Sequence, residues 1–237
     1  MSRLPFVILL LFLCLVIVSW LGSMYGWGMN SMLSTYGLRW MVAMGLENFK
    51  HAPLEEVFLG TMALSTLSES GFLSACRSLF SFKKSYSLKK KRAFQISMLV
   101  LLLLLGLIFV ATFFPGAVLL SAVGTYQGSA IRMGLYPLIL AFFVCVGITY
   151  GYASGTFSNA SDTIRAIVYL PSRIAVFFVT MFMASQLIGC FHYVFEGRMT
   201  QPLMELCGVH VTWHLILQIV LYMIPLTIHI IAAYRHP

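Results

Sequence analysis

The chain has 237 residues, of which 60% are hydrophobic and only 9% are charged, with a formal net charge of +8 and a mean hydropathy of +0.92. A soluble domain carries about 25% charged residues, so this composition excludes a soluble globular protein. It predicts an integral membrane protein whose helices pack in lipid.

Apolar runs of about 20 residues, the length that crosses a bilayer as a helix, recur along the chain. Five of them contain no Asp, Glu, Lys or Arg, whereas a sixth has Glu55 and Glu56 at its start and Glu69 near its end. We therefore predict an all-α integral membrane protein with about six transmembrane helices, over residues 4–22, 53–72, 94–114, 133–153, 174–195 and 211–232.

A further helix is predicted over residues 37–50, between the first two spans. Its apolar residues follow the i, i+3, i+4 spacing of one helical face, but its charges make it too polar to cross a bilayer. Such a segment is typical of an amphipathic helix that lies in the head-group boundary, and Trp40 would join an aromatic belt there.

The second span ends in "LSTLSESGFLSA", in which an acid stands among small hydroxyl residues. Glu69, flanked by Ser68 and Ser70, is the best candidate for a group that binds a coupling ion or a substrate. A carboxylate inside a membrane protein often marks an ion pathway. The alternative is an interfacial group at a helix end.

A basic loop follows, over residues 77–92, with seven Lys or Arg residues and no acid. With six spans, the side of this loop has eleven basic residues and the other side has four, so the positive-inside rule places the loop and both termini in the cytoplasm. Basic residues beside a membrane contact anionic lipid head groups, and this role is predicted for Lys83, Lys84, Lys89, Lys90, Lys91 and Arg92. A nucleic-acid partner is not expected.

Gly147, Gly151 and Gly155 repeat every four residues in the fourth span and its end. A stripe of small residues lets a second helix approach closely, so these three glycines are predicted to form a helix-packing face.

Four residues near the last two spans have side chains that bind metals, namely Cys207, His210, His214 and His192. His210 and His214 would share one face of a helix and could hold a metal, with Cys207 and His192 nearby. His192 and His214 could instead be axial ligands of a haem. The alternative is interfacial histidines that bond to backbone or water, so no cofactor is expected. No catalytic motif supports an enzyme.

The order of several short motifs resembles the AbgT family, the p-aminobenzoyl-glutamate transporters. The motifs are "SWLGSMYGW" (19–27), "GLRWMVAMGLENFKHAPLEEVFLG" (37–60), "SESGFLSAC" (68–76), "GLYPLILAFFVCVGITYGYASGTFSNASD" (134–162) and "MASQLIGCFHYVFEG" (183–197). The resemblance implies a fold of nine membrane helices and two re-entrant hairpins in a dimeric protein about twice this length. The hairpin motifs that would carry the transport site have no match in this chain.

Three functions are consistent with these observations. The first is a shortened AbgT-like scaffold that does not transport and packs against lipid and against membrane partners, either copies of itself or other subunits. The second is a working transporter of p-aminobenzoyl-glutamate or sulfonamide-like solutes that acts as an oligomer. The third is a redox anchor with a histidine-bound cofactor. The missing hairpin motifs favour the first, in the bacterial inner membrane.

Overall fold

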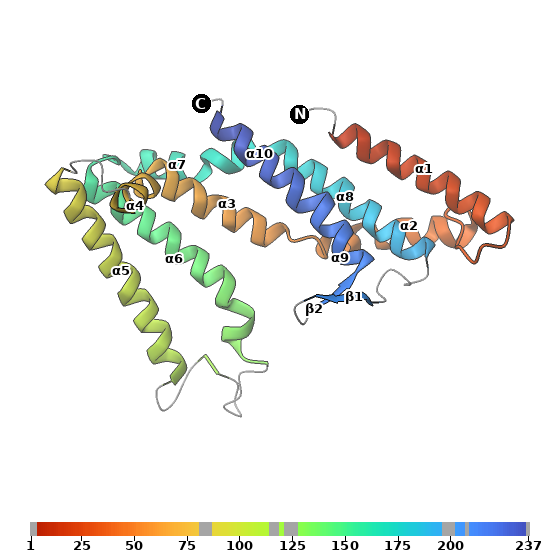
Figure 1. Ribbon diagram of the computed structural model, residues 1–237, viewed down its shortest axis with the longest axis horizontal. Coiled ribbons are helices and arrows are strands. Elements are labelled where there is room, and N and C mark those ends of the chain that lie inside the picture. The colour runs from red at the N-terminus through yellow and green to blue at the C-terminus, as the bar shows by residue number, and fades with distance from the viewer. Residues whose placement is uncertain are drawn as a thin grey trace. The chain divides into compact units, whose positions relative to one another are not determined.

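The computed structural model describes residues 4–80, 87–113, 119–120, 128–195, 202–206 and 209–235. The chain is mainly helical, as predicted, and a short antiparallel hairpin is added to the helices (Figure 1). The elements are α1 (Leu4–Met24), α2 (Thr35–Lys50), α3 (Leu54–Glu69), α4 (Phe72–Phe80), α5 (Leu88–Phe113), α6 (Ala130–Ser154), α7 (Ala160–Arg173), α8 (Ala175–Val194), β1 (Pro202–Leu206), β2 (Val209–Thr212), α9 (Trp213–Gln218), a π-helical turn (Ile219–Met223) and α10 (Ile224–Arg235).

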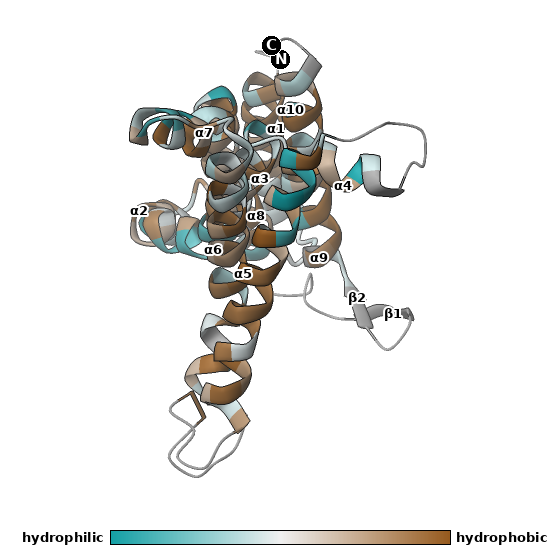
Figure 2. Ribbon diagram, turned by 90° about the vertical axis from the view of Figure 1, so that its left-hand side faces the viewer, coloured by the Kyte–Doolittle hydropathy of each residue, from teal (hydrophilic) through white to brown (hydrophobic). Residues whose placement is uncertain are grey.

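Within the described residues, five helices are long and apolar enough to cross a membrane, at Leu4–Met24, Leu88–Phe113, Gly134–Ser154, Ala175–Val194 and Leu215–Tyr234. They coincide with five of the six predicted spans, because an apolar run in lipid must satisfy its backbone groups internally and does so as a helix. Most of α5 is strongly apolar along its length (Figure 2). The prediction of a multi-pass helical membrane protein is confirmed.

The sixth predicted span forms a shorter helix than expected. The helix α3 has 16 residues and ends at Glu69, which at about 1.5 Å per residue gives a length of about 24 Å. Gly71 then adopts a left-handed backbone with φ of 83°, and the chain turns into the separate helix α4. A side chain at this φ would be strained, so the glycine separates the two helices.

The chain forms two compact units, one made of residues 1–54 and 173–237 and the other of residues 55–172. We call them unit 1 and unit 2 and describe each by itself. In unit 2, α3 lies along α6, since the Tyr136 hydroxyl donates to the Glu56 carbonyl at 3.4 Å near one end. Near the other end, Gly147 lies against the backbone of Thr66.

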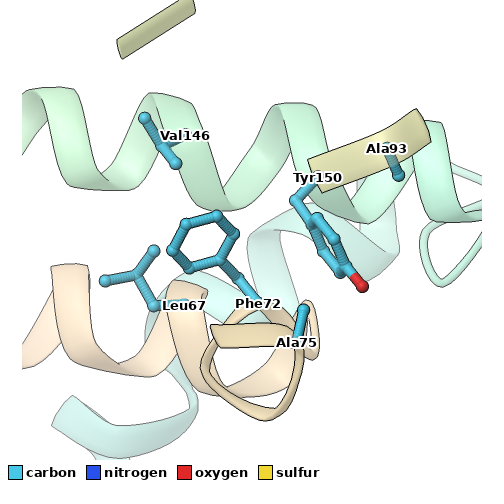
Figure 3. Packing of buried hydrophobic residues seen from close by; sticks show 6 residues of the cluster. All are labelled: Leu67, Phe72, Ala75, Ala93, Val146 and Tyr150. Carbon is cyan, nitrogen blue, oxygen red and sulfur yellow. The ribbon is translucent and has the colours of Figure 1, made fainter. Parts of the chain in front are cut away.

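The core of unit 2 forms where α3 and α4 meet α5 and α6. Phe72 stacks on Phe94 at 5.4 Å between ring centroids and contacts Tyr150 edge-on at 5.6 Å. Figure 3 shows the buried side chains of this cluster, which come from all four helices: Leu67, Phe72, Ala75, Ala93, Val146 and Tyr150. The cluster therefore fixes the turn between α3 and α4 against the two long helices.

A buried hydroxyl of α3 bonds to the backbone of α7. Ser65 Oγ donates to the Ala166 carbonyl at 2.6 Å and accepts from the Leu170 N–H at 3.0 Å. These two backbone groups are four residues apart and bond to each other in a regular helix. The buried serine therefore bridges the backbone of α7 one residue before Pro171, which has no N–H to donate.

Unit 1 is built around α8, which contacts α1, α2 and the last helix. The segment after α1 folds back on it, because Met32 N–H donates to Ser19 Oγ at 3.2 Å. The last helix runs from α9 to α10 through the π turn, in which the Ile224 N–H bonds to the Ile219 carbonyl. Pro225 follows and cannot donate to the carbonyl four residues before it, so the helix adjusts locally at this point.

Candidate functional site

The helix α2 runs lengthwise along α8, in the opposite direction. Near the start of α2, Trp40 stacks on Tyr193 with 4.7 Å between ring centroids. Near its end, Phe49 contacts Phe182 edge-on at 5.1 Å. The contacts thus extend over twelve residues of α8, from Tyr193 in its last turn to Phe182, beyond its middle.

This packing differs from the placement of a helix that lies flat in the head-group plane. The helix itself forms where it was predicted, and Ser34 caps it by accepting from the Gly37 N–H at 3.0 Å. If α8 crosses the bilayer, however, α2 descends beside it instead of crossing its end. The reason is the polar and small face of α2, on which the Gly45 carbonyl accepts from Gln186 Nε2 at 2.6 Å.

The C-terminal end of α2 therefore lies at the level of the middle of α8. Asn48 contacts Gly189 directly, and its Nδ2 lies 3.5 Å from the acceptor Gln186 Oε1. The helix ends at Lys50, because Pro53 disfavours helical backbone in the residue before it and the next helix begins only at Leu54. The end of α2 therefore brings polar groups alongside α8, although the five predicted charge-free spans have no Asp, Glu, Lys or Arg.

A pocket of about 300 Å³ opens where α2 ends against α8 and the last helix, and we call it the α2–α8 pocket. This volume lies at the lower end of the range for small-molecule sites. Six of the eight lining residues have polar side chains. The eight are Asn48, His51, Ser185, Ile188, Gly189, His192, Gln218 and Tyr222.

The lining of the pocket offers both donors and acceptors and has no Asp, Glu, Lys or Arg. His51 Nδ1 lies 2.8 Å from the Glu47 carbonyl, so it donates there and leaves Nε2 as an acceptor in the neutral ring. The nearest charges in α2 neutralise each other, since Lys50 Nζ lies 2.7 Å from Glu47 Oε2. The pocket is therefore suited to a small polar molecule that is held by hydrogen bonds.

Most of these pocket residues were not predicted as site residues. Among the eight, only His192 was a candidate, and it was assigned to a metal. The stretch "ENFKHAP" held a signal that could have been used, because it gathers Asn48 and His51 just before a helix-ending proline. Gln218 and Tyr222 gave no such signal, since they lie in an otherwise apolar run.

Glu69, the predicted ion-binding acid, belongs to unit 2 and is not among the residues that line this pocket. It is exposed at the last position of α3, while Ser70 is buried and donates to the Leu67 carbonyl at 3.2 Å. Ser68 is half-buried. The three residues form the turn before Gly71, and their role in binding an ion or substrate stays a prediction.

The four predicted metal ligands fall in different elements. His210 lies in β2, where it pairs with Glu205, and His214 lies in α9, so the expectation of one shared helical face is wrong. Proline at the start of β1 and the β-branched residues of β2 favour the hairpin over an extension of the helix. Cys207 lies outside the described residues. Within those residues, no group of three or more His, Cys, Asp or Glu could hold a metal.

The three predicted packing glycines have three different neighbours, all within unit 2. A methyl group on Gly147 would lie 3.1 Å from the Thr66 backbone, so this glycine gives the expected close approach of two helices. A methyl group on Gly151 would overlap the ring of Phe157, just after the same helix. Gly155 ends α6 in a left-handed conformation with φ of 81° and lies beside the amino group of Lys89.

The predicted lipid-contacting residues divide between a described and an undescribed part of the chain. Lys89, Lys90, Lys91 and Arg92 are exposed in the first turns of α5. Lys83 and Lys84 lie outside the described residues. The structure thus places four consecutive basic residues at one end of a membrane-spanning helix.

Comparison with known proteins gives one match. A family model described as the AbgT putative transporter family matches residues 78–230, which is more than half of the chain. The matched stretch includes α5 to α8 and most of the last helix. No curated protein and no solved structure matches the chain.

Proposed function

Because the chain belongs to the AbgT transporter family, we propose that it is a membrane transport protein that binds a small polar solute in the α2–α8 pocket. The observation that carries this proposal is the position of the C-terminal end of α2, where Asn48 in the last turn and His51 at the cap lie beside α8. Secondary transporters bind their solutes near the bilayer midplane, at the ends of interrupted helices.

The hydrogen-bonding groups of the pocket suit a solute rather than a bare ion. Asn48 and Gln218 each carry an amide donor and acceptor, and Tyr222 carries a hydroxyl. The three side chains come from α2, from α9 and from the π turn, so a shift of α2 along α8 would change the distances among them. A transport site must have different affinities in two conformations, and a pocket built from separate helices meets that requirement.

The family suggests the first solutes to test and the membrane in which to expect the protein. Labelled p-aminobenzoyl-glutamate and a labelled sulfonamide are suitable probes, and the bacterial inner membrane is the proposed location. The uncharged side chains of Gln218 and Asn48 do not favour one of these solutes over the other by charge. Both solutes therefore have to be tested.

The test uses the full chain, purified and reconstituted in liposomes with an imposed sodium or proton gradient. We expect gradient-dependent flux of one probe, and a loss of about tenfold in Asn48→Ala and in Gln218→Ala, as each removes hydrogen bonds to the bound solute. Gln95→Ala, at an exposed position of α5, is the matched control and should transport normally. Flux that is equal in all three variants would exclude the pocket as the solute site.

A second candidate is a membrane subunit that does not transport, and the outer face of α2 favours it. Val42 and Leu46 are 86% and 76% exposed on that face, close to the Glu47–Lys50 ion pair. If α8 crosses the bilayer, a charged pair on the helix beside it would be costly to expose to lipid, and a partner subunit would cover it. This candidate predicts no flux in the liposomes and a companion chain that is lost on Val42→Asp but retained on Thr156→Asp, at an exposed loop position.

A further inference from the structure

We propose that one end of unit 2 is a docking surface for anionic phospholipid head groups, built by α7, α4 and the first turns of α5. We call it the basic end. It is independent of the α2–α8 pocket, which belongs to unit 1. The proposal rests on packing, on charge and on two exposed apolar side chains.

Three contacts bring these elements to the same end of unit 2. The Lys89 amino group lies at the C-terminal glycine of α6, Gly155. The Thr163 hydroxyl in α7 donates to the Tyr152 hydroxyl in the last turn of α6 at 3.0 Å. In α4, Phe72 stacks on Phe94 of α5. The start of α5, the end of α6, the start of α7 and the start of α4 are therefore neighbours.

The charge of this end is strongly unbalanced. Six exposed basic residues lie on its elements, namely Arg77, Lys89, Lys90, Lys91, Arg92 and Arg165, against the acids Glu69 and Asp162. The Asp162 carboxylate is already hydrogen-bonded to backbone, because its Oδ2 accepts from the Ser158 and Asn159 N–H groups at 3.0 and 3.2 Å. The described basic residues thus lack enough acidic partners within the unit, which favours an anionic partner outside it.

The exposed face of α7 carries apolar side chains beside one of these cations. Ile164 and Val168 are 62% and 47% exposed and lie one turn apart, with Arg165 next to them. The opposite face, with Ala166 and Leu170, is buried in the unit. A helix with an outward face that mixes apolar and cationic residues is typical of the boundary between head groups and acyl chains.

The long helix α5 indicates why a membrane surface, and not a soluble polyanion, occupies this end. Its apolar length begins at Phe94, directly after the basic run. When α5 crosses the bilayer, Lys89 to Arg92 must lie at the level of the head groups. Ile164 and Val168 lie at the same end of the unit, where acyl chains can cover them while phosphates meet the cations.

The first test measures lipid selectivity on the purified full chain. The protein is equilibrated with equal amounts of phosphatidylglycerol and phosphatidylcholine, and the lipids that stay bound are counted by native mass spectrometry. We expect an excess of phosphatidylglycerol that falls about fivefold for each charge removed at the surface. Arg165→Gln should lower it, whereas Arg132→Gln, an exposed arginine at the opposite end of α6, should not.

The second test asks whether the apolar face meets lipid. A benzophenone side chain at position 168, in bilayers that contain phosphatidylglycerol, should give covalent lipid adducts. The same probe at Ser158, in the polar loop before α7, should give at least fivefold fewer. Equal binding of the two lipids by the wild-type protein, or adduct yields at position 168 no higher than at 158, would overturn the proposal. Because Arg165→Gln changes one exposed side chain, its folding can be verified by an unchanged melting temperature.

Discussion

Asn48 packs so closely on Gly189 that a methyl group added to Gly189 would overlap the Asn48 amide. The contact joins the end of α2 to the middle of α8, at the wall of the α2–α8 pocket. Because position 189 has no side chain, the Asn48 amide can lie directly against the backbone of α8. The position of this amide in the pocket wall therefore depends on one glycine.

Gly189→Ala should displace the Asn48 amide from its place between Gly189 and Gln186 and destabilise the protein by about 1 kcal/mol, the usual net contribution of one hydrogen bond. The measurement is the thermal or denaturant unfolding of the purified protein in detergent. Gly45→Ala is the matched control on the facing helix, because a methyl group there meets nothing within 4 Å. It should stabilise the helix by up to about 1 kcal/mol. Equal effects of the two variants would contradict the close packing.

Gly147→Ala should destabilise unit 2 by about 1–2 kcal/mol, because the new methyl group would meet the Thr66 side chain and also the backbone of α3, which cannot move aside as a side chain can. Gly134→Ala, in the same helix and with open space around it, should not. Gly151→Leu would displace the Phe157 ring and disturb the turn after α6. The readout is the unfolding midpoint of each variant, and a Gly147→Ala protein as stable as Gly134→Ala would exclude the contact.

Ser65→Ala should cost about 1–3 kcal/mol, because it removes a buried hydroxyl that serves the Ala166 carbonyl and the Leu170 N–H at once. Ser97→Ala offers a strict comparison. Ser97 is equally buried, but its hydroxyl only donates to the Ala93 carbonyl of its own helix at 2.9 Å. Its loss should cost less than about 1 kcal/mol. Hydrogen exchange of α7 should rise in Ser65→Ala alone.

The start of α7 should loosen in acid. The Ser158 N–H, followed by the Ser158 hydroxyl and the Asn159 N–H, lowers the pKa of Asp162 below its ordinary value of 3.8. A carboxyl with a depressed pKa stabilises the folded state above its unfolded value, and this contribution is lost as the pH falls through the lower, folded value. Pepsin cleavage between residues 156 and 164 should therefore increase below about pH 3.8.

The acid effect has a direct control. In Asp162→Ala, pepsin should cleave between residues 156 and 164 with the same pH dependence as it shows on an unstructured reference peptide. If the wild-type protein showed that same profile, the carboxylate would not be holding the start of α7.

The topology is expected to place both termini and the basic end in the cytoplasm, because basic residues gather on that side of the spans. In a cysteine-free background, Ser87→Cys should be protected from an impermeant maleimide in intact cells. Thr35→Cys, at the exposed start of α2, should be labelled. Labelling of position 87 with protection of position 35 would reverse the assignment.

The spans were predictable because a charge-free apolar run has one stable form in lipid. The helix at residues 37–50 was predictable from its spacing, whereas its alignment with α8 was not. That alignment depends on Gly45, Asn48 and Gly189, which lie far apart in the chain. The end of the helix at Glu69 was also not predicted. A single glycine such as Gly71 in a mainly apolar run does not by itself indicate that a helix ends there.

The candidate site was largely beyond prediction for a related reason. The polar groups of the pocket include side chains of α2, a helix that is too polar to be counted as a span. Charged residues inside the spans therefore gave no sign of them. The metal-ligand spacing of His210 and His214 assumed a helix that starts before its actual start at Trp213. Local patterns indicate which face of a helix is apolar, but they do not indicate where a second helix ends against it.

The π turn at Ile219–Met223 has a consequence for the pocket wall. Such a turn holds one residue more than an α turn, so its register sets the direction in which every residue before it points. Deletion of Val220 would restore regular α winding and rotate Gln218 about the helix axis by about 100°. The anchored half of the helix, from Ile224 to Arg235, would keep its orientation. The polar lining of the pocket thus depends on an inserted residue as well as on side-chain chemistry.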